Sequence, residues 1–572
     1  MRLKQAELED PLIIQEMTDD RSCSKDSVFG TVVINRKTHF FLFITLIFIL
    51  SCDSKAPEIT SINPKTGKMG EIITLTGKNF GHEREESYIT IAGIAPTGSS
   101  YYLWHDDMIM VRIPELGESG LIYVHAEGKK SNSVLFTNSA SVPRPVEGEG
   151  LGLNPRIASV TPQAGAPGTI ITITGSNFGG SSEGGGVFFS WDYESRVNPF
   201  LVKEPEFIKV SETELGYISW NTREIQVRLP DGAVSGNIEV RTPNGSSLPV
   251  YFNVTGKPGN KIFSEKRSYT VSYSVEIKVN NAENPNTLYL WIPMPITSSA
   301  QRNVSMIYRN MEPFIENHRG VSLFKLDNLE TGSGHSISFS FSADIYSVET
   351  QIAAQSVKNE TNALSVLYTQ NTSLIPVNNS LVKGVINSII GREQNPYVKA
   401  RIIYDWMLKN IQVLEFIPYS ENIAAAIEHK NADPYNAALL FTALARAAGV
   451  PCIPVAGVLI NRDQKTFRHY WAEIWINDFG WVPVDPSLGA GYTVDNFANR
   501  ENPSVFYFGN TDNQRVAFSR GELELAQMEN RGRLVSFNQS YSLQNIWEEA
   551  SSGINSYTSL WGDIIISGIY AQ

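Results

Sequence analysis

Thiols and imidazoles, the side chains best suited to nucleophilic and metal chemistry, are scarce in this chain. Its 572 residues contain three cysteines, Cys23, Cys52 and Cys452, and eight scattered histidines. No two histidines have the i, i+4 spacing of a helical zinc site. We therefore expect no catalytic metal and no cofactor.

Size and charge limit the architecture and the partners. A chain of 572 residues is too long for one hydrophobic core, which predicts roughly three to five domains. The net charge is −12, with 42% hydrophobic and 19% charged residues, an ordinary globular composition. Phosphate binding needs clustered Lys and Arg, and no basic run interleaved with aromatic residues occurs. We expect no nucleic-acid partner.

The N-terminal segment has the pattern of an export leader. A basic stretch precedes an apolar run at 40–50 that is shorter than the ~20 residues of a membrane-spanning helix. The run ends in Ile-Leu-Ser-Cys at 49–52, which resembles the lipobox of bacterial lipoproteins. The alternative is a buried strand or short helix. Residues 1–35 are polar, so we expect a start codon assigned too far upstream, with true initiation near Val32 or Val33.

This resemblance implies that residues 1–51 are a leader and that Cys52 carries lipid. We then expect an exported protein, anchored to a bacterial membrane through its N-terminal lipid and lying in the periplasm or on the outer surface. The mature fold would keep Cys452 alone, which excludes an intrachain disulfide framework and any multi-cysteine metal site.

A repeat with a period of 98 residues follows the leader. The lettering of residues 57–81 returns at 155–179, including the runs Ile-Ile-Thr-Leu-Thr-Gly at 72–77 and Ile-Ile-Thr-Ile-Thr-Gly at 170–175. Such alternation predicts strands with one buried face, and the Gly and Asn positions mark tight turns.

The two copies, 56–138 and 155–254, resemble IPT/TIG domains, above all in the Gly-x-Asn-Phe-Gly turns that begin at Gly77 and Gly175. The resemblance implies two immunoglobulin-like β-sandwiches that act as spacers or protein-contact modules. We expect a stalk. The alternative is an adhesion or assembly protein whose working surfaces lie on this pair.

The C-terminal half changes from strands to helices and back. Alternating residues predict a further β domain at 262–350, and helical spacing predicts helices at 395–411 and about 434–448. Three strands follow, within a core domain at 360–525. Residues 526–572 are predicted to be a C-terminal extension, with a helix around 546–549.

The core domain resembles the transglutaminase-like superfamily. The matching residues are Ala-Leu-Leu-Phe at 438–441, Gly-Val-Pro at 449–451, His-Tyr-Trp-Ala-Glu-Ile at 469–474 and Gly-Trp-Val-Pro-Val-Asp-Pro at 480–486. The resemblance implies a papain-like α+β core. The predicted fold class is therefore multidomain and mainly β: two immunoglobulin-like sandwiches, a β domain and this core.

The same resemblance implies a Cys-His-Asp triad in which His469 is the base and Asp485 orients its ring. The nucleophile should stand four residues before Ala438, and that position is Pro434. Asp433 and Pro434 instead suit the N-cap and the first position of a helix. His469 and Asp485 are then relics of a triad, hydrogen-bonded in an aromatic cleft with Trp471 and Trp481.

The alternative nucleophiles are Cys452 and Asp433. Cys452 follows the far end of the helix, about 22 Å from its start. It also lies some seven residues along a strand from the position facing His469, about 20 Å away, so a buried apolar role is expected. Asp433 would form a reactive anhydride that nothing in the sequence stabilises.

The sequence thus predicts an envelope lipoprotein with an inactive transglutaminase-like domain that binds or scaffolds an envelope protein, a peptide or a glycan. The alternative is an active envelope amidase, protease or acyltransferase with a non-cysteine nucleophile. It requires Asp433 or Cys452 within about 3–4 Å of the His469 ring.

Overall fold

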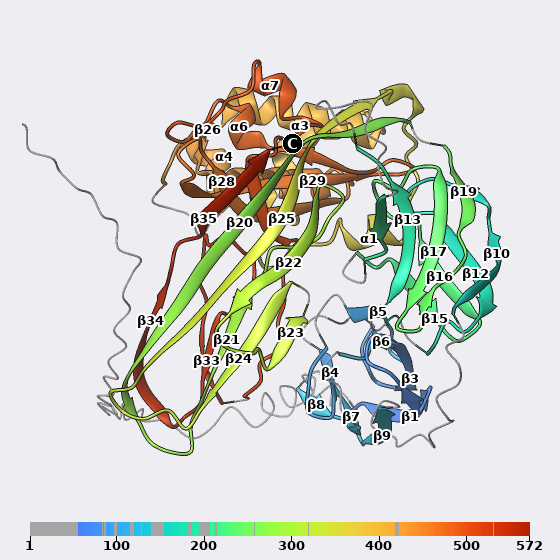
Figure 1. Cartoon of the computed structure of the whole chain (residues 1–572), viewed down its shortest axis with the longest axis vertical. Coiled ribbons are helices and arrows are strands. Elements are labelled where there is room, and N and C mark those ends of the chain that lie inside the picture. The colour runs from blue at the N-terminus through green and yellow to red at the C-terminus, as the bar shows by residue number, and fades with distance from the viewer. Residues whose placement is uncertain are drawn as a thin grey trace, which may run out of the picture. The chain divides into compact units, whose positions relative to one another are not determined.

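The computed structural model describes residues 55–571, except 83, 85–86, 97–99, 115–118, 127, 139–153, 181, 183–184, 194–205, 212–213, 257, 319, 418–422 and 530 (Figure 1). The predicted leader and Cys52 lie outside the described residues. Within the described ranges, no helix has both the length and the apolar character needed to cross a bilayer. The chain forms two compact units, of which the first combines residues 1–143 with Lys278–Ala282 and Asn555–Thr558, and the second holds the rest.

The first repeat is a sandwich of two antiparallel-rich sheets. One sheet has the order β1 (Glu58–Asn63), β3 (Ile72–Lys78), β6 (Met108–Arg112), β5 (Tyr101–Trp104). The other has the order β2 (Thr66–Gly67), β9 (Val134–Asn138), β7 (Gly120–Ala126), β4 (Tyr88–Ile91), with β8 (Lys129–Lys130) beside β7. The alternation of β3 buries Ile73 and Leu75 completely, as the pattern predicts.

The second repeat has the same plan, in the second unit. One sheet has the order β10 (Arg156–Thr161), β12 (Ile170–Ser176), β16 (Glu224–Arg228), β15 (Tyr217–Trp220). The other has the order β11 (Ala164–Gly165), β19 (Val250–Val254), β17 (Gly236–Thr242), β13 (Gly186–Trp191), β14 (Glu206–Lys209), with β18 (Gly245–Ser246) beside β17.

The shared Gly-x-Asn-Phe-Gly turn has a steric explanation. A Cβ on Gly77 would lie 2.2 Å from the Phe80 ring and 2.1 Å from the Glu58 carbonyl oxygen. Asn79 adopts a left-handed φ of 60°, a conformation that asparagine tolerates better than most residues. The turn therefore brings Phe80 back into the core, where it is fully buried.

The β domain is built from two further sheets. The first has the order β22 (Gln301–Arg309), β25 (Gly334–Ile352), β20 (Gly259–Ala282), β34 (Ile554–Trp561), with β35 (Ile565–Ala571) also paired to β20. The second has the order β23 (Ile315–His318), β24 (Val321–Asp327), β21 (Thr287–Pro293), β33 (Glu548–Ala550), β32 (Arg533–Val535).

The segment 526–572 thus supplies four strands to the β domain instead of forming a separate extension. The helix predicted at 546–549 is wrong, because Glu548–Ala550 form a strand against Leu288–Leu290. The buried Glu549 carboxylate accepts hydrogen bonds from the backbone of Met528 and Glu529, partners that local sequence does not reveal.

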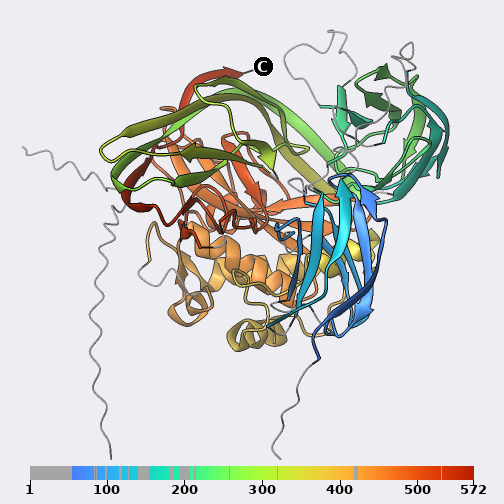
Figure 2. The same ribbon diagram turned by 90° about the horizontal axis from the view of Figure 1, so that it is seen from below.

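The core domain packs helices on one face of a four-stranded antiparallel sheet (Figures 1 and 2). The sheet order is β30 (Gly480–Val484), β29 (Thr466–Ile476), β28 (Cys452–Ile460), β31 (Arg515–Arg520). The main helices are α2 (Ser380–Ile389), α3 (Pro396–Asn410) and α5 (Pro434–Ala447), and α1 (Ala363–Leu367), α4 (Ala425–His429), α6 (Pro486–Gly489) and α7 (Pro503–Phe506) are short. Every residue of α5 from Pro434 to Arg446 is buried, which makes it the central helix.

Ion pairs with little solvent exposure join the second repeat to the core domain. Arg520 of β31 binds Glu473 of β29, with Nε–Oε2 at 2.6 Å, and also contacts Glu214 of the repeat. Lys261 Nζ contacts Asp231 Oδ1 at 2.5 Å and donates to the Trp481 carbonyl at 2.6 Å. The second repeat is therefore part of a larger packed body, which differs from the spacer that its sequence predicts.

Replacing Arg520 tests this connection. Arg520→Met leaves the carboxylates of Glu214 and Glu473, which are 26% and 18% exposed, without their counter-charge, and we expect a loss of about 1–3 kcal/mol in the free energy of unfolding, measured in urea. Arg241→Met is the matched control, because Arg241 pairs with Glu239 at a partly exposed site and should cost about 0–1 kcal/mol. Equal losses of stability in the two variants would contradict a stabilising role of Arg520 between the second repeat and the core domain.

Candidate functional site

The start of α5 is organised as a helix cap. Asp433 Oδ1 accepts hydrogen bonds from the Asn436 backbone N at 2.8 Å and from Asn436 Nδ2 at 2.9 Å, and Oδ2 accepts from Gln539 Nε2 at 3.1 Å. Pro434 follows at the first helical position, where no backbone N–H is needed. Burial raises the pKa of Asp433, which is 3% exposed. Its carboxylate serves as a cap whose two oxygens are both hydrogen-bonded.

His469 and Asp485 are brought together as the sequence predicts. His469 lies on β29 and Asp485 follows β30, and Nε2 of the ring is 2.7 Å from Asp485 Oδ2. Asp485 Oδ1 also accepts from the Leu488 backbone N at 3.0 Å, which caps α6. An ionised carboxylate only accepts, so a neutral His469 carries its proton on Nε2 and has a lone pair on Nδ1.

The Nδ1 atom of His469 is the notable feature of this site. The side chain is fully buried, and within the described part of the chain Nδ1 has no hydrogen-bond partner. In a thiol enzyme the ring nitrogen opposite the orienting carboxylate takes the proton of the nucleophile. Among the described residues, neither Asp433 nor Cys452 is hydrogen-bonded to this atom.

A buried arginine holds the carboxylate from behind. Arg515 Nη1 lies 3.1 Å from Asp485 Oδ2, and Nη2 lies 2.6 Å from Asp512 Oδ2. Burial alone would raise the pKa of Asp485, but contact with His469 and Arg515 brings it below its usual range. Arg515 and Asp512 belong to no motif in the sequence and were not predicted as site residues. Their only local signal is an oppositely charged pair three residues apart, just before a strand.

Aromatic rings flank the imidazole. The Trp471 and Tyr492 rings lie 6.3 and 6.4 Å from the His469 ring and nearly parallel to it. Trp481, predicted in the same cleft, lies elsewhere: its ring is 5.3 Å from Trp475 and belongs to a cluster beside the second repeat. The reason is register, since Trp481 pairs with Trp475, six residues and about 20 Å along β29 from His469.

Cys452 is a core residue. It faces Ile474, and His469 faces Gly457, so the separation along β28 is five residues and about 16 Å instead of the predicted seven. The thiol is fully buried, and Sγ lies 3.8 Å from Thr442 Oγ1. Burial raises the pKa of Cys452 to about 12, which leaves it as an unreactive thiol at neutral pH.

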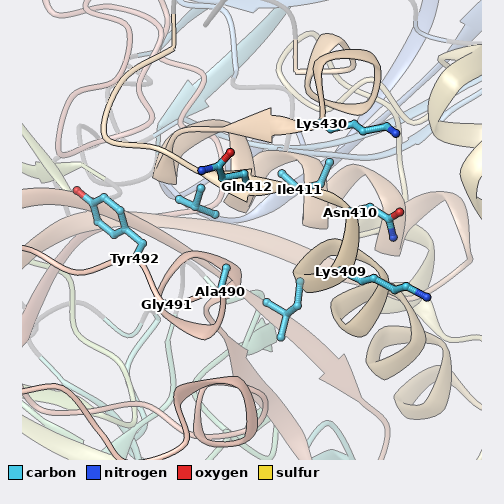
Figure 3. Close-up of a pocket in the computed structure, with 10 residues that line it drawn as sticks. Lys409, Asn410, Ile411, Gln412, Lys430, Ala490, Gly491 and Tyr492 are labelled. Carbon is cyan, nitrogen blue, oxygen red and sulfur yellow. The ribbon is translucent and has the colours of Figure 1, made fainter.

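A depression of about 480 Å³ opens beside the site (Figure 3). The end of α3, the short strand β26 (Gln412–Val413) and the loop after α6 line it, and Tyr492 belongs both to this lining and to the ring stack on His469. Figure 3 places Lys409 and Lys430 toward one end and Tyr492 at the other. Amides, ammonium groups and one ring suit a polar ligand. No sequence pattern predicts this depression, because its lining comes from the end of α3, a two-residue strand and a loop that are separate in the chain.

Comparison with known families agrees with this architecture. The transglutaminase-like superfamily matches residues 383–486, and the IPT/TIG domain family matches residues 57–139 and 155–192. The chain therefore carries a transglutaminase-like domain and IPT/TIG domains on a multidomain, mainly β fold.

Individual relatives cover the chain in part. An uncharacterized protein of Haemophilus influenzae is 25% identical over 191 residues, which are 27% of this chain and 51% of that protein. A cyclomaltodextrin glucanotransferase of Bacillus licheniformis is 30% identical over 90 residues, 16% of this chain and 12% of the enzyme. The chain thus spans about half the length of the first relative and far less of the second.

Solved structures resemble the chain more distantly. A candidate cysteine protease from Cytophaga hutchinsonii matches 55% of this chain and 92% of its own, with a TM-score of 0.34 and 12% identity. The protein SGBP-B from a xyloglucan utilization locus of Bacteroides uniformis matches 51% of this chain and 99% of its own, with a TM-score of 0.13 and 13% identity. Neither likeness bears on function.

The buried carboxylate predicts a specific pH dependence. Asp485→Asn removes one partner of buried Arg515, and we expect a loss of about 3 kcal/mol in the free energy of unfolding at pH 7. Because the pKa of Asp485 is lowered in the fold, its stabilisation is complete above the unfolded value of about 3.9 and is lost as the pH falls below it.

The difference in the free energy of unfolding between wild type and Asp485→Asn should therefore narrow as the pH falls below about 4 in urea titrations, and should keep narrowing through the lowered pKa of Asp485. Asp405→Asn is the control, since Asp405 forms an exposed pair with Arg401 and its removal should change stability by less than about 0.5 kcal/mol. A pH-independent gap would show that the carboxylate charge is not what stabilises the site.

Proposed function

We propose that this protein is an exported lipoprotein whose transglutaminase-like domain binds or scaffolds a partner and does not catalyse acyl transfer. The proposal rests on the start of α5, where Asp433 caps the helix and Pro434 occupies its first position. The family resemblance places the nucleophile at this position. The proposed relic pair, His469 and Asp485, remains hydrogen-bonded as a structural element.

Three observations support the absence of catalysis. Nδ1 of His469 has no partner from which to take a proton, and Asp433 is engaged by Asn436 and Gln539. Cys452 is buried with a pKa near 12. Loss of a triad nucleophile removes most of the rate enhancement, and what remains comes from binding alone.

Binding is the role that the surroundings of the site favour. The depression beside Tyr492 offers two amides, two lysines and the edge of the ring stack on His469. Such a lining suits an extended peptide or a glycan of an envelope partner, held by hydrogen bonds and one aromatic contact. The ligand would then be recognised next to the relic pair, without any bond being broken.

Activity measurements test the proposal directly. Wild type and His469→Ala should give equal, background rates in amidase, protease and crosslinking assays, because no nucleophile is present for the imidazole to activate. Thiol-directed acylating probes should leave Cys452 unmodified in the native protein and modify it after unfolding, as read by peptide mass mapping. Hydrolysis or crosslinking that disappears with His469→Ala would overturn the proposal.

The proposed lipid anchor has its own test. In bacteria fed an alkynyl fatty acid, the wild-type protein should carry the label and sediment with membranes, because Cys52 follows an Ile-Leu-Ser lipobox. Cys52→Ser should lose both properties, whereas Cys23→Ser, in the proposed leader, should retain them. Equal labelling of the two variants would contradict attachment at Cys52.

A further inference from the structure

A segment near the C-terminus contacts both sides of the junction between α5 and β29. We call residues 537–543 the strap. Its Gln539 Nε2 donates to Asp433 Oδ2 at 3.1 Å, at the start of α5, and its Ser540 carbonyl accepts from Tyr470 Oη at 2.7 Å, next to His469 on β29. The Tyr435 and Tyr470 rings meet edge to face at 5.0 Å between these two contacts. The strap therefore lies where the proposed nucleophile position and the sheet meet.

The two ends of the strap are anchored in different clusters, and the residues next to Phe537 are the more exposed part. On its C-terminal side the Leu543 backbone N donates to Ser519 Oγ at 2.9 Å, Leu543 joins the main core, and the Tyr541 ring packs 5.0 Å from Phe518. On the other side, residue 538 is exposed and Gln539 is only half-buried. Phe537 packs against Trp547 and Trp561, in the β domain.

Among the residues that the structure describes, two hydrogen bonds, made by Gln539 and Ser540, attach the middle of the strap to the core domain, whereas its flanks are anchored in aromatic clusters. A segment held at both ends and weakly in the middle can lift from a surface without unfolding of the domain. Asp433 and Tyr470 are 3% and 4% exposed under it, so the start of α5 is closed in this conformation.

We propose that the strap is an autoinhibitory cover: it occupies the surface at the start of α5, and an external peptide reaches that surface only after the Gln539 and Ser540 contacts open. This inference rests on the proposed binding function, since it concerns access to the same domain. The proposed function concerns what the domain does, whereas the cover is the element that limits access to the domain.

Reporter chemistry tests the cover without a known ligand. Pro434→Cys introduces a thiol under the strap, and its rate of modification by iodoacetamide in the full-length chain is followed by peptide mapping. Adding Gln539→Ala should raise this rate at least tenfold, because one of the two contacts is removed. Adding Gln527→Ala should leave this rate unchanged, because Gln527 precedes the strap and its side chain donates to the Gly532 carbonyl.

Hydrogen exchange provides a second measurement that needs no change in α5. The Asn436 backbone N–H, bonded to Asp433, should exchange at least tenfold faster in Gln539→Ala and in Tyr470→Phe than in wild type or Gln527→Ala. Unchanged exchange and unchanged thiol modification would overturn the cover. Neither readout needs a ligand or a catalysed reaction, so failure of the proposed function would leave both unaffected.

Discussion

The burial of one carboxylate organises the core domain. Asp485 accepts hydrogen bonds from His469, from Arg515 and from the start of α6, so a single side chain fixes β29, β31 and the turn after β30. A buried charge is tolerated only when it is paired and hydrogen-bonded, which makes each of these partners necessary to the others. The arrangement can persist for structural reasons after a catalytic role is lost. A His-Asp pair at hydrogen-bond distance is therefore weak evidence of catalysis by itself.

The same logic applies to the start of α5. A helix needs acceptors for its first backbone N–H groups, and Asp433 followed by Pro434 meets that need well. A cysteine at the same place would give reactivity but no better cap. Selection for stability alone therefore favours residues of the type found here. Helix stability therefore explains the residues at the start of α5.

Short-range patterns in the sequence predicted much of this structure, and long-range contacts account for what they missed. The Ile-Thr alternation predicted the buried Ile73 and Leu75, and the Asp433-Pro434 pair predicted the helix start, because each rule acts over a few residues. The predicted position of Trp481 was wrong because strand register places its ring beside Trp475. Arg515 has no sequence signal as a site residue because its partner Asp485 lies 30 residues away in the chain.

Distance along the chain also hid the relation between the C-terminal segment and the site. The side chains of Gln539 and Asp433 meet across 106 residues, and Arg520 meets Glu214 across 306. Both contacts join a charged group of one domain to a segment that sequence patterns assign to another. Because a buried charge without its partner is costly, such contacts tie neighbouring domains more firmly than their separate hydrophobic cores would. Arg520 therefore ties the transglutaminase-like core to the second repeat, and Gln539 ties it to the C-terminal segment beside the site.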